Sequence, residues 1–133
     1  MPITITGVTA STYVASDCIK VGEAVPAFSM VYRLGEVYML ADATDLAKSR
    51  AAYFTLTTGA LDEFVFAVPL SGYSLGLIGP TLVQGTQYVL SATPGGIDAR
   101  SALVTGNFIT ELFLASDAST AKWSLDVTEI AVG

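Results

Sequence analysis

Glycines recur along almost the whole chain and divide it into apolar pieces of strand length. Those pieces are rich in Val, Ile, Thr, Tyr and Phe, which suit the pleated, half-buried surface of a sheet. Strands of about 5–6 residues with turns roughly every 8–12 residues are typical of a sandwich or barrel. The sequence therefore predicts an all-β, antiparallel, sandwich or barrel-like fold. The dividing glycines are Gly7, Gly22, Gly35, Gly59, Gly72, Gly76, Gly79, Gly85, Gly95, Gly96 and Gly106.

Several segments show the two-residue alternation of a strand directly. Ile3 and Ile5 alternate with threonines near the start of the sequence, and Leu125 and Val127 alternate with polar residues near its end. In the stretch 63–70, the even-numbered residues share one face and the odd-numbered residues take the other. The stretch 30–40 predicts a hairpin that turns around Gly35, because glycine readily supplies the positive φ of such turns.

One segment carries a helical pattern, so we expect the fold to include one or two short helices. Residues 42–52 have Thr44 or Asp45 as a candidate N-cap and basic residues near the opposite end. The segment is too short to be stable alone and is predicted to cross an end of the sheet. The stretch 112–122 favours a loop over a second helix, because Ser and Asp compete for backbone hydrogen bonds.

The chain has 133 residues, a normal length for one domain, and no linker or low-complexity tract divides it. We therefore expect a single β-rich domain over residues 1–133, with a possible extended N-terminal arm at about 1–20. No run approaches the ~20 apolar residues that a membrane helix needs. The start of the sequence lacks the basic region and apolar core of a signal peptide.

The composition combines many apolar residues with few charges. Hydrophobic residues make up 52% and charged residues 14%, and the net charge is −6. An acidic chain repels phosphate backbones, so binding to nucleic acid is disfavoured. Soluble monomers rarely expose large apolar patches, so one interpretation is that other protein chains cover much of this surface. The alternative is a compact monomer with a large core and a surface rich in Thr and Ser.

Residues suited to nucleophilic or acid–base catalysis are poorly placed in this sequence. Histidine, the commonest general base, is absent. Ser49 lies between Lys48 and Arg50, where a solvated helix end is the better interpretation. Lys20 could lower the thiol pKa of Cys18. The neighbouring Ile and Val instead predict a buried, unreactive cysteine.

The remaining polar motifs also have simple structural interpretations. The adjacent pair Asp62 and Glu63 predicts the tip of a hairpin. Asp42 and Asp45 are too sparse for a calcium loop. The glycine-rich stretch 72–80 lacks a following basic residue or helix, so it predicts tight turns rather than a phosphate-binding loop. The sequence therefore predicts no catalytic, cofactor-binding or metal-binding residues, no cofactor, and a protein that is not an enzyme.

Aromatic residues offer one further possibility. Trp123, beside a polar loop, and Tyr73 could form a platform for carbohydrate. Tryptophan beside a loop also anchors cores and protein interfaces, and packing of this kind is the preferred interpretation.

The most distinctive stretch is residues 82–97, which contains the sequence Tyr88-Val89-Leu90-Ser91 followed by Thr93-Pro94-Gly95-Gly96. Tyr88 and Leu90 would share one face of a strand, and the Pro-Gly pair suits a tight turn. This stretch resembles a hairpin of bacteriophage capsid decoration (cement) proteins. Residues 21–24 and 38–43 look similar to the opening of those proteins. The resemblance covers roughly residues 20–115.

The resemblance implies a virion structural protein that binds the outer surface of the phage capsid and stabilises the shell. Its expected partners are the major capsid protein and further copies of itself in a trimer or dimer, with no nucleic acid and no membrane. Its expected location is the virion, on the outer surface of the capsid. The alternative is a phage fibre or baseplate module that binds host-surface carbohydrate through Trp123 and Tyr73.

Overall fold

The computed structural model describes residues 2–10 and 15–133, and most of its regular structure is β-strand. The all-β antiparallel architecture predicted from the sequence is confirmed. One sheet has six strands in the order β1-β7-β11-β10-β8-β9, and the other has five in the order β2-β6-β5-β3-β4. The strands are β1 (Gly7–Ala10), β2 (Asp17–Lys20), β3 (Met30–Leu34), β4 (Val37–Leu40), β5 (Ala51–Thr55), β6 (Phe64–Pro69), β7 (Ser71–Ile78), β8 (Gln87–Leu90), β9 (Ile97–Ala99), β10 (Phe108–Ala115) and β11 (Thr120–Ala131).

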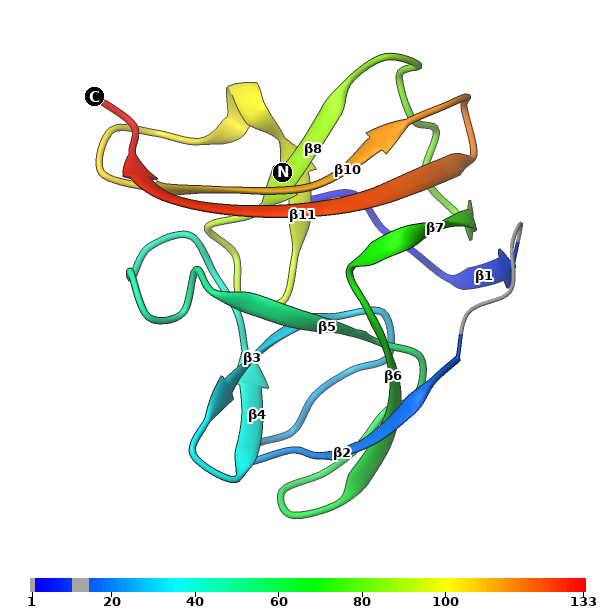
Figure 1. Ribbon diagram of the computed structural model, residues 1–133, viewed down its shortest axis with the longest axis vertical. Helices are drawn as coiled ribbons and strands as arrows, with labels where there is room; N and C mark the ends of the chain where they lie inside the picture. The colour runs from blue at the N-terminus through cyan, green and yellow to red at the C-terminus, as the bar shows by residue number, and fades with distance from the viewer. Residues whose placement is uncertain (1, 11–14) are drawn as a thin grey trace.

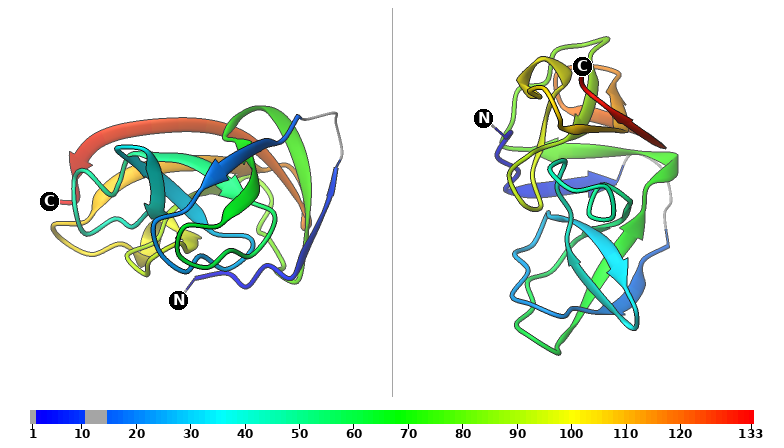
Figure 2. Two further views of the ribbon diagram at one scale, coloured as in Figure 1. Left: turned by 90° about the horizontal axis from the view of Figure 1, so that it is seen from below. Right: turned by 90° about the vertical axis from the view of Figure 1, so that its left-hand side faces the viewer.

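The two sheets lie toward opposite ends of an elongated molecule (Figures 1 and 2). The chain passes from one sheet to the other at Leu70, between β6 and β7. β1 pairs with β7 and β2 pairs with β6, so the N-terminal part of the chain also contributes to both sheets. Residues that were predicted as an extended arm thus form edge strands at Gly7–Ala10 and Asp17–Lys20.

The main core lies between the sheets, with Trp123 of β11 near its centre. The Trp123 ring lies 5.0 Å from the Phe113 ring and 5.3 Å from the Phe54 ring, measured between centroids. Trp123 is 2% exposed, and both phenylalanines are fully buried. Phe54 belongs to the five-stranded sheet and Phe113 to the six-stranded sheet, so Trp123 joins the two sheets.

A second, smaller core lies inside the five-stranded sheet, which curls into a half-barrel (Figure 1). Its buried residues are Ile19, Val21, Val25, Val31, Val65 and Ala67. The curl brings the two edge strands together where Val21 bridges Tyr38 and the Gly22 amide donates to the Tyr38 carbonyl at 3.0 Å. Both faces of this sheet are therefore apolar, one against the other sheet and one inside the curl.

Two of the hairpins expected from the sequence, over residues 30–40 and 82–97, are present. β3 and β4 are joined by a turn in which Gly35 has a φ of 64°. β8 and β9 pair as expected, and Tyr88 and Leu90 pack in the main core. The Gly96 amide donates to the Thr93 carbonyl at 3.0 Å, and Gly95 between them has a φ of 75°. The Pro-Gly turn therefore has the predicted chemistry.

The helix expected over residues 42–52 does not form. Asp45 accepts hydrogen bonds from the amides of Ala47 and Lys48, as an N-cap does, but only one turn follows. Ala51 already begins strand β5, and pairing in the sheet outweighs a helix this short. The 3-10 turn η1 (Arg100–Ala102) is the helical element in the described part of the chain.

Three other local predictions need correction. Residues 2–6, with Ile3 and Ile5, lie beside the sheet without forming a strand, although both isoleucines pack on the core. The expected loop 112–122 shrinks to residues 116–119, because Asp117 accepts from the Ser119 and Thr120 amides and closes a tight connection. The glycine-rich stretch after Leu70 is strand β7 rather than a series of turns.

Candidate functional site

The outer face of strands β2 and β6 carries a cluster of exposed apolar side chains, which we call the β2–β6 patch: Cys18, Phe64 and Phe66. Phe64 is 65% exposed and Phe66 is 54% exposed. Cys18 lies directly across the strand pair from Phe66. Alternation along β6 directs Val65 and Ala67 into the half-barrel and the two phenylalanines outward. The other sheet does not cover this end, so the phenylalanines face solvent.

The position of Cys18 differs from the sequence prediction. The prediction of a buried thiol is wrong, because Cys18 is exposed in the structure. Its neighbour Ile19 takes the inward position on β2, and strand alternation places Cys18 on the outer face. The apolar neighbours therefore indicated a strand correctly but did not reveal which face the cysteine occupies.

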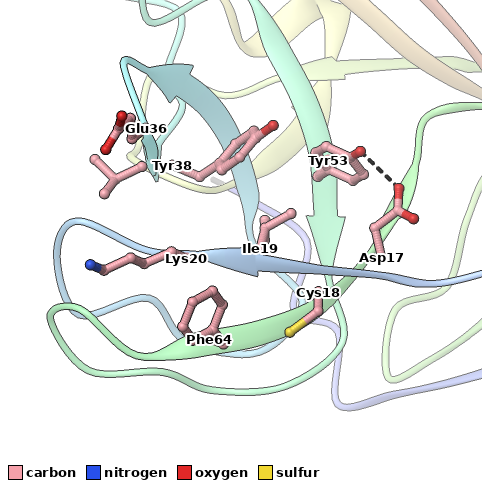
Figure 3. Close-up of a pocket in the computed structure, with 9 residues that line it drawn as sticks. Asp17, Cys18, Ile19, Lys20, Glu36, Tyr38, Tyr53 and Phe64 are labelled. Atoms are coloured by element: carbon pink, nitrogen blue, oxygen red, sulfur yellow. Dashed lines mark hydrogen bonds between the residues drawn. The ribbon is translucent and has the colours of Figure 1, made fainter.

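An open groove of about 570 Å³ lies between the edge strands β2 and β4, where they diverge beyond their contact at Tyr38 (Figure 3). Its walls combine apolar side chains with two carboxylates and one ammonium group. Figure 3 shows Asp17 at one end and Glu36 near the other, with Ile19 between them. The lining residues are Asp17, Cys18, Ile19, Lys20, Glu36, Val37, Tyr38, Tyr53 and Phe64.

Two tyrosines form the aromatic part of this groove. The rings of Tyr38 and Tyr53 meet edge to face, with centroids 5.4 Å apart. The Tyr53 hydroxyl donates to Asp17 Oδ2 at 2.8 Å (Figure 3). This hydrogen bond, together with burial and the negative charge of Asp17, raises the pKa of Tyr53 to about 12. Tyr53 is therefore a neutral hydrogen-bond donor throughout the physiological pH range.

An alkaline titration tests this hydrogen bond. We expect Tyr53 to ionise near pH 12, and Asp17→Asn to lower its pKa toward the ordinary value of 10.0. The difference in ultraviolet absorbance between the protein and its Tyr53→Phe variant isolates this phenol. Because the folded pKa is raised, the bond stabilises the fold below pH 10.0, and this contribution is lost as the pH rises toward 12. An unchanged Tyr53 pKa in Asp17→Asn would contradict the assignment.

Ser49 and Glu63, two of the residues considered for catalysis, make structural hydrogen bonds. Ser49 is buried, and its hydroxyl donates to the Leu46 carbonyl at 2.7 Å. Asp62 lies at a hairpin tip with a φ of 67°, as predicted. The Glu63 carboxylate accepts a hydrogen bond from the Ala60 amide at 2.6 Å and so closes the same tip. These contacts bring no nucleophile together with a base.

The aromatic residues suggested for carbohydrate binding are both in the core. Trp123 is 2% exposed and Tyr73 is 6% exposed, and their rings are stacked 6.3 Å apart. Burial raises the pKa of Tyr73. The suggested platform is therefore wrong, and the packing interpretation of Trp123 is confirmed. Neither ring can contact a glycan in the folded protein.

Asp42 and Asp45, considered above for calcium, lie in one tight turn. Asp42 and Asp45 accept hydrogen bonds from nearby amides in the turn that replaces the predicted helix. Across residues 2–10 and 15–133, no group of three or more His, Cys, Asp or Glu side chains is placed to hold a metal ion. In the same residues, no helix has the length and apolar character needed to span a membrane.

The groove and the β2–β6 patch were not predicted from the sequence. The groove combines residues from four strands and depends on how far the sheet curls. The alternation of residues 63–70 indicated that Phe64 and Phe66 share one face of a strand. It did not indicate that this face is exposed, because apolar residues occupy both faces there. Comparison with protein-family models finds no match for this chain, and a search of curated proteins finds no relative.

Proposed function

We propose that this chain is a structural protein that docks on a protein assembly through the β2–β6 patch, and that the assembly is a phage capsid. The observation that carries the docking proposal is the pair of exposed phenylalanines on adjacent outward positions of β6. Aromatic residues are enriched at protein interfaces, and contiguous exposed apolar side chains often mark interaction sites. The choice of a capsid rests on the resemblance of residues 20–115 to decoration proteins.

Binding to an assembled shell would account for a stabilising role without chemistry. A protein that binds only the assembled form shifts the equilibrium toward that form by mass action. Aromatic anchors that leave water on docking supply most of the binding free energy at such interfaces. The proposed location is the outer surface of the capsid, where the net charge of −6 keeps the protein from competing for packaged DNA.

We infer that further copies of the chain assemble as a dimer or trimer on that surface, and that the chain is not an enzyme. The contacts of Ser49 and Glu63 support the second inference, because their polar groups are already used within the fold. The carbohydrate-binding alternative needs a surface other than the one first considered, because Trp123 and Tyr73 are buried. Specific binding on a glycan array would favour that alternative.

Co-sedimentation with capsids tests the proposed function. Purified protein is mixed with undecorated capsids of the phage that encodes it, and the pellet and the capsid melting temperature are measured. We expect stoichiometric binding and a higher melting temperature of the capsid. Absence of both effects would refute the capsid as the partner.

A matched pair of variants tests the surface. Replacing Phe64 and Phe66 together by serine should weaken capsid binding by about tenfold or more, since a factor of ten corresponds to only about 1.4 kcal/mol and truncation of a single hot-spot residue costs about 2 kcal/mol or more. The control replaces Val83 and Val104, which are 65% and 64% exposed outside the patch, by serine. The control should bind as the original protein does. Equal binding by both double variants would show that another surface docks.

A further inference from the structure

The groove between β2 and β4 shares Cys18 and Phe64 with the β2–β6 patch, so a partner docked on the patch would also reach the groove. We propose that this groove receives the side chain of a lysine or arginine presented by the protein partner. This inference rests on the proposed function only in taking the partner to be a protein. It does not depend on the identity of that protein.

The walls of the groove suit an aliphatic stem. The groove's apolar lining residues beside the two tyrosines include Ile19, Val37 and Phe64, and Phe64 is 65% exposed. The methylene groups of lysine and arginine pack on apolar surface of this kind while their charged ends remain near solvent. The tyrosine rings also attract a cation at their faces.

The charges of the groove favour a cation over an anion. Asp17 and Glu36 are both lining residues, against a single Lys20. The Lys20 ammonium lies 4.0 Å from Asp62 Oδ1, which partly balances its charge. Asp17 is held in place by the Tyr53 hydroxyl, so one carboxylate is already oriented before any ligand arrives. A guanidinium or ammonium group is the complementary partner for such an arrangement.

The shape of the groove favours a side chain over a free ion or small molecule. The groove is open to solvent and does not enclose a ligand as small-molecule sites do. A free cation would retain most of its hydration there and bind weakly. A side chain carried by a partner is brought to the groove by the larger contact at the patch, which raises its effective concentration.

The first test uses the isolated protein. N-acetylarginine methylamide is titrated in the millimolar range while the tyrosine resonances of Tyr38 and Tyr53 are followed by nuclear magnetic resonance. The neutral citrulline analogue, a methyl glycoside and spermidine are titrated in parallel. We expect the arginine compound to shift both tyrosines, and the Asp17→Asn/Glu36→Gln variant to lose that response. The Asp126→Asn variant, altered at an exposed carboxylate on β11, should retain the response.

The contradicting results are equally specific. No shift with arginine, or an equal shift with citrulline or the glycoside, would overturn the recognition of a cation. Tighter binding of spermidine than of N-acetylarginine methylamide would overturn a protein side chain as the occupant.

The second test uses the assembly. Asp17→Asn/Glu36→Gln should weaken capsid binding by about fivefold at low salt and by less at high salt, because exposed ion pairs are screened. Asp126→Asn should have no effect. If the original protein binds capsids and the double variant binds equally well, the groove does not receive a cationic side chain of the partner. The proposed function would then still stand. Failure of the original protein to bind capsids would refute the proposed function, and the arginine titration would still decide the groove.

Discussion

Replacing Trp123 by alanine is expected to lower the free energy of unfolding by about 3–5 kcal/mol, the range for large-to-small changes at buried aromatic sites. Trp123 contacts aromatic rings of both sheets, so its removal opens a void between them. Residues around the void belong to paired strands and can collapse only in part. Because Trp123 is the single tryptophan, unfolding is followed by circular dichroism in denaturant rather than by fluorescence.

The Trp123→Phe variant is the matched control. It keeps an aromatic ring in the core and removes the indole N–H, which has no hydrogen-bond partner among the described protein atoms. We therefore expect it to lose clearly less stability than the alanine variant. A loss below about 1 kcal/mol for Trp123→Ala, typical of surface sites, would contradict the central position of this residue.

Replacing Gly79 by alanine is expected to destabilise the protein by about 2–3 kcal/mol or more, since backbone strain and a clash add together. Gly79 has a φ of 113°, a backbone conformation that residues with a Cβ rarely adopt. An added Cβ would lie 2.6 Å from the carbonyl oxygen of Thr4. The segment at Thr4 would have to move, which breaks the bond from the Thr6 amide to the Ile78 carbonyl at 2.8 Å.

Gly85→Ala separates the two causes. Gly85 also has a positive φ, 81°, but an added Cβ meets nothing within 4 Å. We expect a loss of about 1–2 kcal/mol from strain alone. Hydrogen exchange of the Thr6 amide gives the local measurement: protection should fall in Gly79→Ala and persist in Gly85→Ala. Equal losses and equal protection in both variants would refute the close approach at Thr4.

The fold was predictable where local signals and strand pairing agree. The glycine spacing indicated an all-β chain, and Gly35 and the Pro94-Gly95 pair marked their turns because few residues adopt those conformations. The signals failed where pairing overrode a local preference. Residues 42–52 have helical caps, yet Ala51 joins a strand. Gly76 lets β7 pack closely against Thr9 of β1, in a segment that was taken for turns.

The candidate sites could not be predicted because they depend on which face of a strand is covered. Cys18 and Phe66 lie opposite each other on the outer face of the sheet. Residues 64–70 have apolar side chains on both faces, so the sequence does not show which face is buried. The groove forms because β2 and β4 meet where Val21 bridges Tyr38. These strands are distant in the sequence, so no local sequence pattern predicts that they meet. Trp123, by contrast, was placed correctly because a large aromatic in a strand is most often buried.

The position of β11 between β7 and β10 has a consequence for synthesis of the protein. Until residues 120–131 leave the ribosome, β7 and β10 have no shared neighbour, and the six-stranded sheet cannot be completed. A nascent or truncated chain would expose two unpaired strand edges, which are templates for aggregation. Folding of this sheet therefore waits for residues 120–131, because this strand pairs with both β7 and β10.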